Sequence, residues 1–176
     1  MIPVFTFDRS EEVVPGFAVA VHRAEFTKAI AAEDVHTFGG KDLVLVDDRA
    51  QFAEVAILRA FEAEGWEGRW LETYGKPAMK PALWREWKLE GPAAQEHVSI
   101  EVPWVIERLH AIAVANGNTY AGCWDVVAWK EGRLVFAESK KQKKDRLRGT
   151  QLRWLEAALT CGMTVEDFLM VEWRLR

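Results

Sequence analysis

Three residues near the middle of the chain have the types and spacing of a divalent-cation site. Asp125 precedes one apolar stretch, Glu138 follows a second, and Lys140 comes two residues later. If Glu131-Gly132 forms a two-residue hairpin loop, Asp125 lies directly opposite Glu138, and Lys140 leaves the same face. Opposed carboxylates repel, and a hard cation such as Mg²⁺ removes the repulsion by binding both. A lysine beside that cation can steady a phosphate or orient a water molecule.

This interpretation depends on the register of the hairpin. A three-residue loop would shift the pairing by one residue and place Asp125 on the face opposite to Glu138. The alternative interpretation is that both acids are charges at strand ends that reach water. The neighbouring residues favour a site, because Val126, Val135 and Phe136 are apolar and charges in such strands are seldom tolerated without a partner.

The elements that must position these residues follow from hydrophobic periodicity and turn signals. We expect strands over residues 17–21, 43–46, 66–74, 120–129, 133–139 and 168–175, and helices over 25–32, 49–64, 104–115 and 150–159. Asp48 and Gly65 are the expected ends of the 49–64 helix. Residues 75–97 are expected to be a proline-rich excursion with a short helix around 83–89. Strands apolar on both faces, with helices between them, predict an α/β fold with helices on both sides of a central sheet.

A basic segment follows the acids and lysine directly. Residues 140–153 hold seven basic residues and one acid, a net +6 in a chain of net −4, so the remainder carries −10. This asymmetry indicates one local surface for an anionic partner, although an isolated run of this kind can also be a solvated loop. Besides Lys140, the basic side chains are Lys141, Lys143, Lys144, Arg146, Arg148 and Arg153.

The composition sets the broad class. The 176 residues are 49% hydrophobic and 28% charged, as in an ordinary globular domain. No apolar run is long enough for a membrane helix, and the N-terminal residues carry no signal-peptide pattern. Cys123 and Cys161 form no metal-binding or disulfide pattern, so we expect reduced thiols and a cytoplasmic protein without a membrane partner.

The central residues resemble a known family. Asp125, then Glu138-Ser139-Lys140, a basic loop and a helix beginning Thr150-Gln151-Leu152-Arg153-Trp154 resemble the PD-(D/E)xK nuclease superfamily, and most closely its VRR-NUC branch. The resemblance covers about residues 48–175. Trp124 stands where the family motif often has proline, which affects the branch assignment more than the chemistry.

The resemblance implies a role for each matching residue. Asp125 and Glu138 would bind Mg²⁺ together with the Ser139 carbonyl, and Mn²⁺ would substitute for Mg²⁺. Lys140 would orient or activate water, and Gln151 would lie near the site. An acid on the first helix often completes such sites, and Glu54 is the best match. It shares a helical face with apolar residues, so it would point toward the core unless it has a task. Alternatively, Glu54 is a flank acid favoured by the helix dipole, and Gln151 an exposed first-turn residue.

The resemblance also implies a fold. We expect a restriction-endonuclease-like core in the order α-β-β-β-α-β, with a mixed central sheet flanked by helices. Residues 1–47 would be an N-terminal extension packed on this core, and residues 48–176 the nuclease-like domain, with a helical insertion at about 75–118. Members of the branch often act on branched or flapped DNA, and the small stand-alone members resemble dimeric junction cutters. A homodimer would supply two sites for two strands.

Three functions compete at this point. The first is hydrolysis of DNA phosphodiester bonds, selective for DNA structure, with a sequence-specific restriction-type endonuclease as its nearest rival. The second is a non-catalytic nucleic-acid-binding module on the same fold. The third is a structural protein in which Lys140 neutralises the two acids. Other patterns are weaker: the histidines are scattered, Gly39-Gly40-Lys41 lacks the rest of a P-loop, and Trp84 and Trp87 are core or base-stacking residues.

Overall fold

The structure is a computed structural model that describes residues 9–14, 16–30, 37, 40–73, 80–142 and 147–176. In chain order the elements are β1 (Arg9–Val14), β2 (Phe17–Phe26), β3 (Val44–Val46), β4 (Arg49–Gln51), α1 (Ala53–Ala63), β5 (Glu67–Glu72), β6 (Ala82–Trp84), the 3₁₀ helix η1 (Pro92–Ala94), α2 (Pro103–Ala115), β7 (Val126–Lys130), β8 (Arg133–Lys141), α3 (Gly149–Thr160), the 3₁₀ helix η2 (Val165–Asp167) and β9 (Phe168–Leu175). In this part of the chain no helix is both long and apolar enough to cross a membrane.

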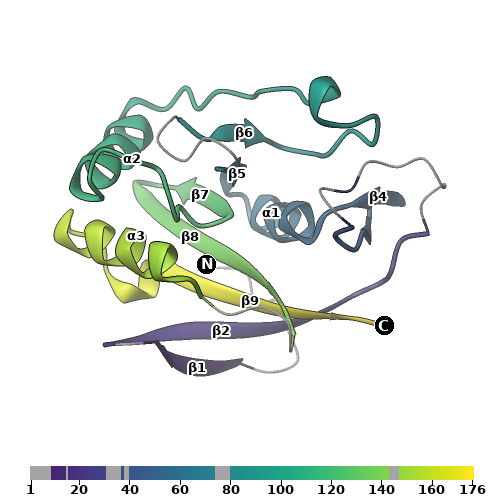
Figure 1. Ribbon diagram of the computed structural model, residues 1–176, viewed down its shortest axis with the longest axis horizontal. Coiled ribbons are helices and arrows are strands. Elements are labelled where there is room, and N and C mark those ends of the chain that lie inside the picture. The colour runs from purple at the N-terminus through teal and green to yellow at the C-terminus, as the bar shows by residue number, and fades with distance from the viewer. Residues whose placement is uncertain (1–8, 15, 31–36, 38–39, 74–79, 143–146) are drawn as a thin grey trace.

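One mixed sheet organises the molecule (Figure 1). Its seven strands lie in the order β1-β2-β9-β8-β7-β5-β6. β9 is parallel to both of its neighbours, β2 and β8, and the other pairs are antiparallel. The described part of residues 1–47 therefore contributes β1 and β2 to this sheet, while β3 and β4 form a separate hairpin.

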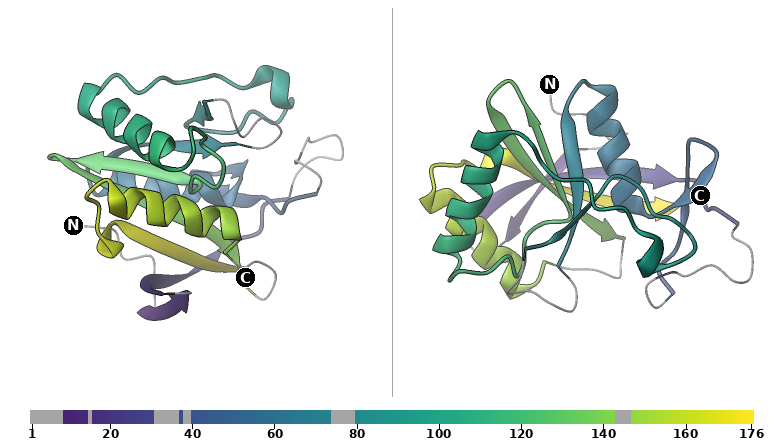
Figure 2. Two further views of the ribbon diagram at one scale, coloured as in Figure 1. Left: turned by 60° about the vertical axis from the view of Figure 1, so that its left-hand side comes forward. Right: turned by 90° about the horizontal axis from the view of Figure 1, so that it is seen from above.

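Helices cover both faces of the sheet, which confirms the predicted α/β architecture (Figure 2). α1 packs on one face and α2 and α3 on the other. The strands supply alternate residues to the two cores, as the two-residue period of a strand requires. On β8, for example, Val135 packs toward α1 with Ile57, whereas Phe136 packs toward α3 with Trp154. This division explains why β7 and β8 are apolar on both faces.

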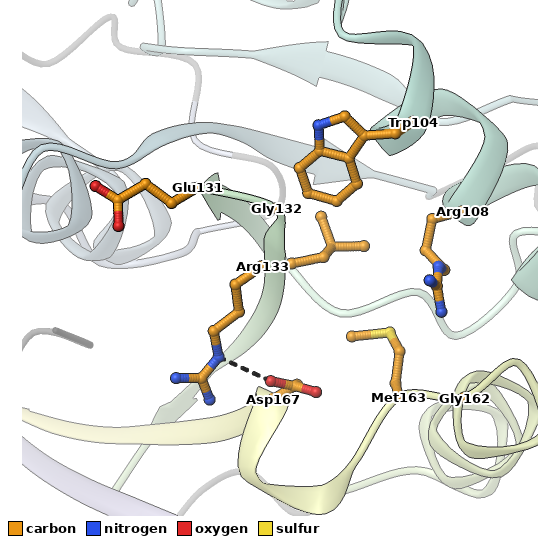
Figure 3. A pocket seen from close by; sticks show the side chains of 9 residues that line it. Trp104, Arg108, Glu131, Gly132, Arg133, Gly162, Met163 and Asp167 are labelled. Carbon is orange, nitrogen blue, oxygen red and sulfur yellow. Dashed lines mark hydrogen bonds and ion pairs between the residues drawn. The ribbon is translucent and has the colours of Figure 1, made fainter.

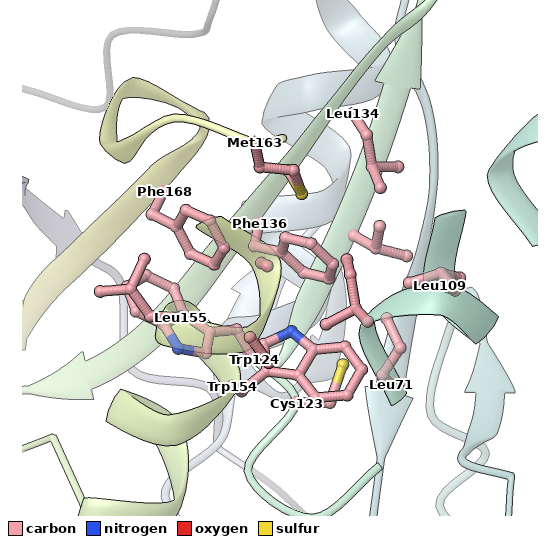
Figure 4. Packing of buried hydrophobic residues seen from close by; sticks show 14 of the residues in the cluster. Leu71, Leu109, Cys123, Trp124, Leu134, Phe136, Trp154, Leu155, Met163 and Phe168 are labelled. Carbon is pink, nitrogen blue, oxygen red and sulfur yellow. The ribbon is translucent and has the colours of Figure 1, made fainter. Parts of the chain in front are cut away.

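Aromatic rings fill the core beneath α2 and α3 (Figure 4). The Phe136 ring stacks on Phe168 with centroids 5.2 Å apart, and Trp124 meets Phe168 edge-on at 4.9 Å. Trp154 contacts Phe136 edge-on at 6.0 Å. Such contacts fix α3 against β8 and β9 and set where the first turn of α3 lies.

The β7–β8 hairpin has the two-residue loop that the sequence predicted. Lys130 pairs with Arg133, and Val126 pairs with Ala137. Glu131 and Gly132 both have positive φ, 50° and 79°, as a type I′ turn requires. The alternative three-residue loop is therefore wrong.

Two predicted helices are not helices. Residues 25–26 end β2 and pair with β9, where Glu25 forms an ion pair with Arg174. Residues 27–30 are not helical, with Lys28 in an isolated bridge to Val44, and residues 31–32 lie outside the described residues. Residues 83–89 hold part of β6, which pairs with the edge of β5. There Trp84 and Trp87 are buried against Trp70. In both segments, strand pairing and aromatic burial outweigh the local helix propensity. Trp84 and Trp87 are core residues.

The helix expected over residues 49–64 begins later than predicted. Arg49–Gln51 is strand β4, and Phe52 rather than Asp48 occupies the N-cap. Asp47 and Asp48 instead have positive φ, 48° and 60°, in the β3–β4 turn. The helix ends as predicted before Gly65, whose φ is 77°.

Candidate functional site

The hairpin register places Asp125, which directly precedes β7, against Glu138 of β8. The Asp125 amide donates a hydrogen bond to Glu138 Oε2 at 3.3 Å, and the Ser139 amide donates to Asp125 Oδ2 at 2.9 Å. Each carboxylate therefore reaches across to the backbone of the other's strand. Glu138 is 2% exposed, whereas Asp125 keeps a partly exposed surface.

Lys140 and Gln151 complete a small network around Glu138. Lys140 Nζ lies 2.8 Å from Glu138 Oε1 and 3.2 Å from Gln151 Oε1. The Gln151 side-chain amide donates to Glu138 Oε1, and the Arg148 backbone N–H donates to Gln151 Oε1 at 2.9 Å. Gln151 is therefore turned so that its amide group faces the carboxylate and its oxygen faces the ammonium.

A glycine before β7 allows α3 to approach the site. Gly122 has φ +81°, and a Cβ there would lie 2.1 Å from the Thr150 carbonyl oxygen. Beside it, the Trp124 indole N–H donates to the Gln151 carbonyl oxygen at 3.2 Å. These contacts hold the first turn of α3 against the start of β7, and so place Gln151 beside Glu138.

Glu54 of α1 joins the acids from the other side. It is 7% exposed, and Lys41 Nζ lies 3.4 Å from its Oε1. Its charge also acts on Asp125 strongly enough to raise the pKa of that carboxyl group. Of the five side chains predicted for catalysis, hydrogen bonds therefore join Asp125, Glu138, Lys140 and Gln151, and Glu54 acts on Asp125 through its charge.

The electrostatics of the site disfavour two bare carboxylates. Burial raises the pKa of Asp125 well above its ordinary value, and the charges of Glu138 and Glu54 raise it further. Lys41 and the Ser139 amide lower it only in part. Burial also raises the pKa of Glu138, against the opposing effect of Lys140. An added cation would therefore be attracted to this point.

The donor set fits a cation that needs few protein ligands. In the described part of the chain no group of three or more His, Cys, Asp or Glu side chains has metal-binding geometry. Asp125 and Glu138 supply hard carboxylate oxygens side by side, and Mg²⁺ is commonly bound by one or two carboxylates together with water and substrate phosphate. Ser139, whose carbonyl was a predicted ligand, lies between Glu138 and Lys140, and its hydroxyl accepts the Trp173 indole N–H at 2.9 Å.

The predicted basic surface is described only in part. Lys143, Lys144 and Arg146 lie outside the described residues. Arg148 and Arg153 are exposed, at the start and in the first turns of α3. The Lys141 ammonium is directed to other groups: it forms an ion pair with Asp42 and lies 5.6 Å from the centroid of the Trp173 ring.

Sequence reasoning missed Lys41 and Glu72. Burial alone would lower the pKa of Lys41, but Glu54, Asp125 and Glu72 together hold it above its ordinary value. Glu72 ends β5, next to Leu71, whose amide donates to the Asp125 carbonyl at 2.7 Å. The only signal for Lys41 was the Gly39-Gly40-Lys41 pattern, which we compared with a P-loop.

A separate hollow of about 260 Å³ lies at the far end of the hairpin (Figure 3). Trp104, Leu134 and Met163 contribute apolar surface to it. Three of its charged groups have partners: Arg133 pairs with Asp167 at 3.0 Å, and Arg108 donates to the Cys161 carbonyl at 2.6 Å near the end of α3. The hollow contains none of the predicted site residues.

Comparisons with known proteins add no relative. No family model, no curated protein and no solved structure matches the chain.

Proposed function

We propose that the protein is a Mg²⁺-dependent nuclease that hydrolyses DNA phosphodiester bonds. The observation that carries the proposal is the meeting of Asp125 and Glu138 across the β7–β8 hairpin with Lys140 against Glu138 at 2.8 Å. Bound there, Mg²⁺ would supply charge to the phosphate and lower the pKa of a coordinated water. Asp125 and Glu138 would hold the ion, with the Ser139 carbonyl as a further oxygen and Mn²⁺ as an accepted substitute.

Lys140 has the geometry to orient the attacking water. Its ammonium group has three N–H donors. Within the described part of the chain, two of them are directed to Glu138 and Gln151. The third donor is left for the water or for a phosphate oxygen. Because Gln151 and Glu138 fix the ammonium from two sides, Lys140 would act as a pre-positioned donor.

The order of the elements supports the proposed restriction-endonuclease-like core. α1, β5, β7, β8, α3 and β9 occur in the order α-β-β-β-α-β when strand β6, helix α2 and the 3₁₀ helices η1 and η2 are set aside. β6, η1 and α2 lie between β5 and β7 as the inserted segment. The side chains proposed for catalysis lie on or beside α1, β7, β8 and α3 of this order. We therefore include this core in the proposal.

We further propose that the enzyme selects DNA by its shape. Arg148 and Arg153 are exposed on the α3 side of the acids, where they can contact phosphates, which carry no sequence information directly. Among the residues that carry the proposed chemistry, none lies on a helix or β-ribbon that is shown to enter a DNA groove and contact base edges. Branched or flapped DNA is the proposed substrate class.

A cleavage assay tests this function. Wild-type protein is incubated with branched, flapped and linear DNA in Mg²⁺, Mn²⁺ or EDTA, beside Asp125→Asn, Glu138→Gln and Lys140→Ala. We expect cleavage in both metals, none in EDTA, and a loss of at least about 100-fold in each variant. Glu156→Gln is the matched control, because Glu156 is an exposed acid on α3.

The assay also separates the rival functions. Cleavage by Asp125→Asn at the wild-type rate would overturn the proposed mechanism. Tight DNA binding without cleavage in either metal would instead identify a binding module. Equal cleavage of branched and linear DNA, restricted to one sequence, would identify a restriction-type enzyme.

A further inference from the structure

A second lysine reaches the acids from outside the α-β-β-β-α-β order. Lys41 lies in the segment between β2 and β3, and its ammonium is 3.4 Å from Glu54 Oε1. The same ammonium is 5.9 Å from the centroid of the Phe52 ring, next to the start of α1. The charges of Asp125 and Glu72 also act on this ammonium and help to raise its pKa. The site therefore has two cations, Lys140 on the Glu138 side and Lys41 on the Glu54 side.

Backbone hydrogen bonds fix the segment that carries Lys41. The Ala29 amide donates to the Leu43 carbonyl at 3.0 Å, and the Leu45 amide donates to the Thr27 carbonyl at 2.8 Å. These bonds hold the residues just after Lys41 against the end of β2. The position of Lys41 is therefore set by the fold and not by its own side chain alone.

A side-chain ion pair fixes the same segment to the central sheet. Asp42 pairs with Lys141, and the Lys141 ammonium lies 5.6 Å from the Trp173 ring centroid. Lys141 follows Lys140 on β8. Two consecutive residues of the segment thus contact the site and the strand that builds it.

The two lysines differ in their access to solvent. The Lys140 side chain is 11% exposed and is held by Glu138 and Gln151. The Lys41 side chain is 48% exposed, and its partner Glu54 is 9% exposed. A phosphate that approaches from solvent would therefore meet Lys41 before Lys140. The Lys41 ammonium has three N–H donors, and the hydrogen bond to Glu54 Oε1 uses one of them. Other donors can therefore contact a phosphate.

We propose that Lys41 is a substrate-binding residue whose ammonium contacts a backbone phosphate of the DNA strand beside the acids. The inference rests on the proposed function for the identity of the ligand. The strand would be held on the Glu54 side by Lys41 and on the α3 side by Arg148, with Asp125 and Glu138 between them. Each such contact releases a counterion from the DNA, so its loss has a measurable salt signature.

The test measures binding without metal or cleavage. A fluorescein-labelled flapped duplex is titrated with Asp125→Asn protein in EDTA at several salt concentrations, with and without Lys41→Ala. We expect Lys41→Ala to weaken binding about fivefold at moderate salt, as for one partly exposed charge pair. The slope of log K against log salt should fall in magnitude by about 0.9, the value of one phosphate contact. Lys41→Arg should keep the slope.

A matched control is Lys28→Ala, since Lys28 is an exposed lysine on the same polypeptide segment. It should leave the slope unchanged. The structural alternative is that Lys41 only neutralises Glu54. Lys41→Ala would then lower the melting temperature, Glu54→Gln would restore it, and the salt slope would stay at its starting value, which would overturn the proposal.

The outcomes distinguish this proposal from the nuclease function. A wild-type protein that cleaves DNA while Lys41→Ala leaves the slope unchanged refutes the role of Lys41 alone. If Lys41→Ala lowers the slope of log K against log salt but the wild-type protein cleaves no DNA, only the proposed nuclease function is refuted. Absence of DNA binding refutes both.

Discussion

Replacing Asp125 by asparagine should stabilise the metal-free protein at pH values above the raised pKa of Asp125. Asp125 lies opposite Glu138, where Cβ atoms of paired residues are about 4.5–5.5 Å apart. Asparagine removes one charge and keeps an oxygen that can accept the Ser139 amide, now 2.9 Å from Oδ2. The variant therefore loses the repulsion without losing this hydrogen bond.

The size of the effect follows from the geometry. Two unit charges about 5 Å apart repel by roughly 3 kcal/mol at an effective dielectric constant near 20. The variant also loses the attraction of Asp125 to Lys41, which is about 1 kcal/mol or less because Lys41 is half exposed. The net gain is about 2 kcal/mol, equivalent to about 4–8 °C in melting temperature for a chain of this size.

The gain should depend on pH with a defined sign. Burial and the neighbouring acids raise the pKa of Asp125 in the folded protein, so the folded state holds a proton that the unfolded state has released. Wild-type stability should therefore fall as pH rises from about 4, the ordinary pKa, toward the raised value, by at most about 1.4 kcal/mol per pH unit. Below this window both proteins carry a neutral group and their curves should converge.

Urea unfolding in EDTA across the pH range measures this difference, with Glu156→Gln as the control for loss of an exposed acid. Parallel curves for wild type and Asp125→Asn, or a less stable variant at pH 8, would show that the two carboxylates do not repel each other. The electrostatic description of the site would then be wrong.

Further substitutions test how the site is supported. Lys140→Met should destabilise the fold by about 3 kcal/mol in urea, because Glu138 is 2% exposed and loses its cation, and adding Glu138→Gln should recover most of that loss. Gly122→Ala should cost about 4 kcal/mol, since its Cβ would meet the Thr150 carbonyl at 2.1 Å. Gly132 has a similar φ of +79° but open space around an added Cβ. Gly132→Ala should therefore lower the free energy of unfolding by only about 1–2 kcal/mol, as measured by thermal unfolding. Equal losses of stability at the two glycines would refute the close approach of α3 to Gly122.

The local sequence was sufficient to predict the centre of the site. The Glu131-Gly132 turn has the positive φ values that select a two-residue loop, and the loop alone determines that Asp125 opposes Glu138. Likewise β9 begins and ends where the sequence predicted a strand, at Phe168 and Leu175. These features depend on interactions between residues close in sequence.

Other features could not be predicted in this way. Residues 83–89 have a helix-compatible pattern, yet Trp84 and Trp87 are buried against Trp70 on a neighbouring strand. Residues 25–26 extend β2 because β9, nearly 150 positions away, offers parallel pairing. Burial and strand pairing with distant segments outweigh a propensity of a few tenths of a kcal/mol per residue.

The sequence by itself determined the chemistry of this protein's candidate site: two acids and a lysine whose spacing across a tight turn makes them converge. The tertiary structure decided what surrounds them. It brings Lys41 to Glu54 through strand and ion-pair contacts of a segment outside the predicted core, and it seats Gln151 by the close approach of α3 to Gly122. Such contacts join residues far apart in the chain, so no local pattern encodes them, and only the packed sheet and helices bring them together.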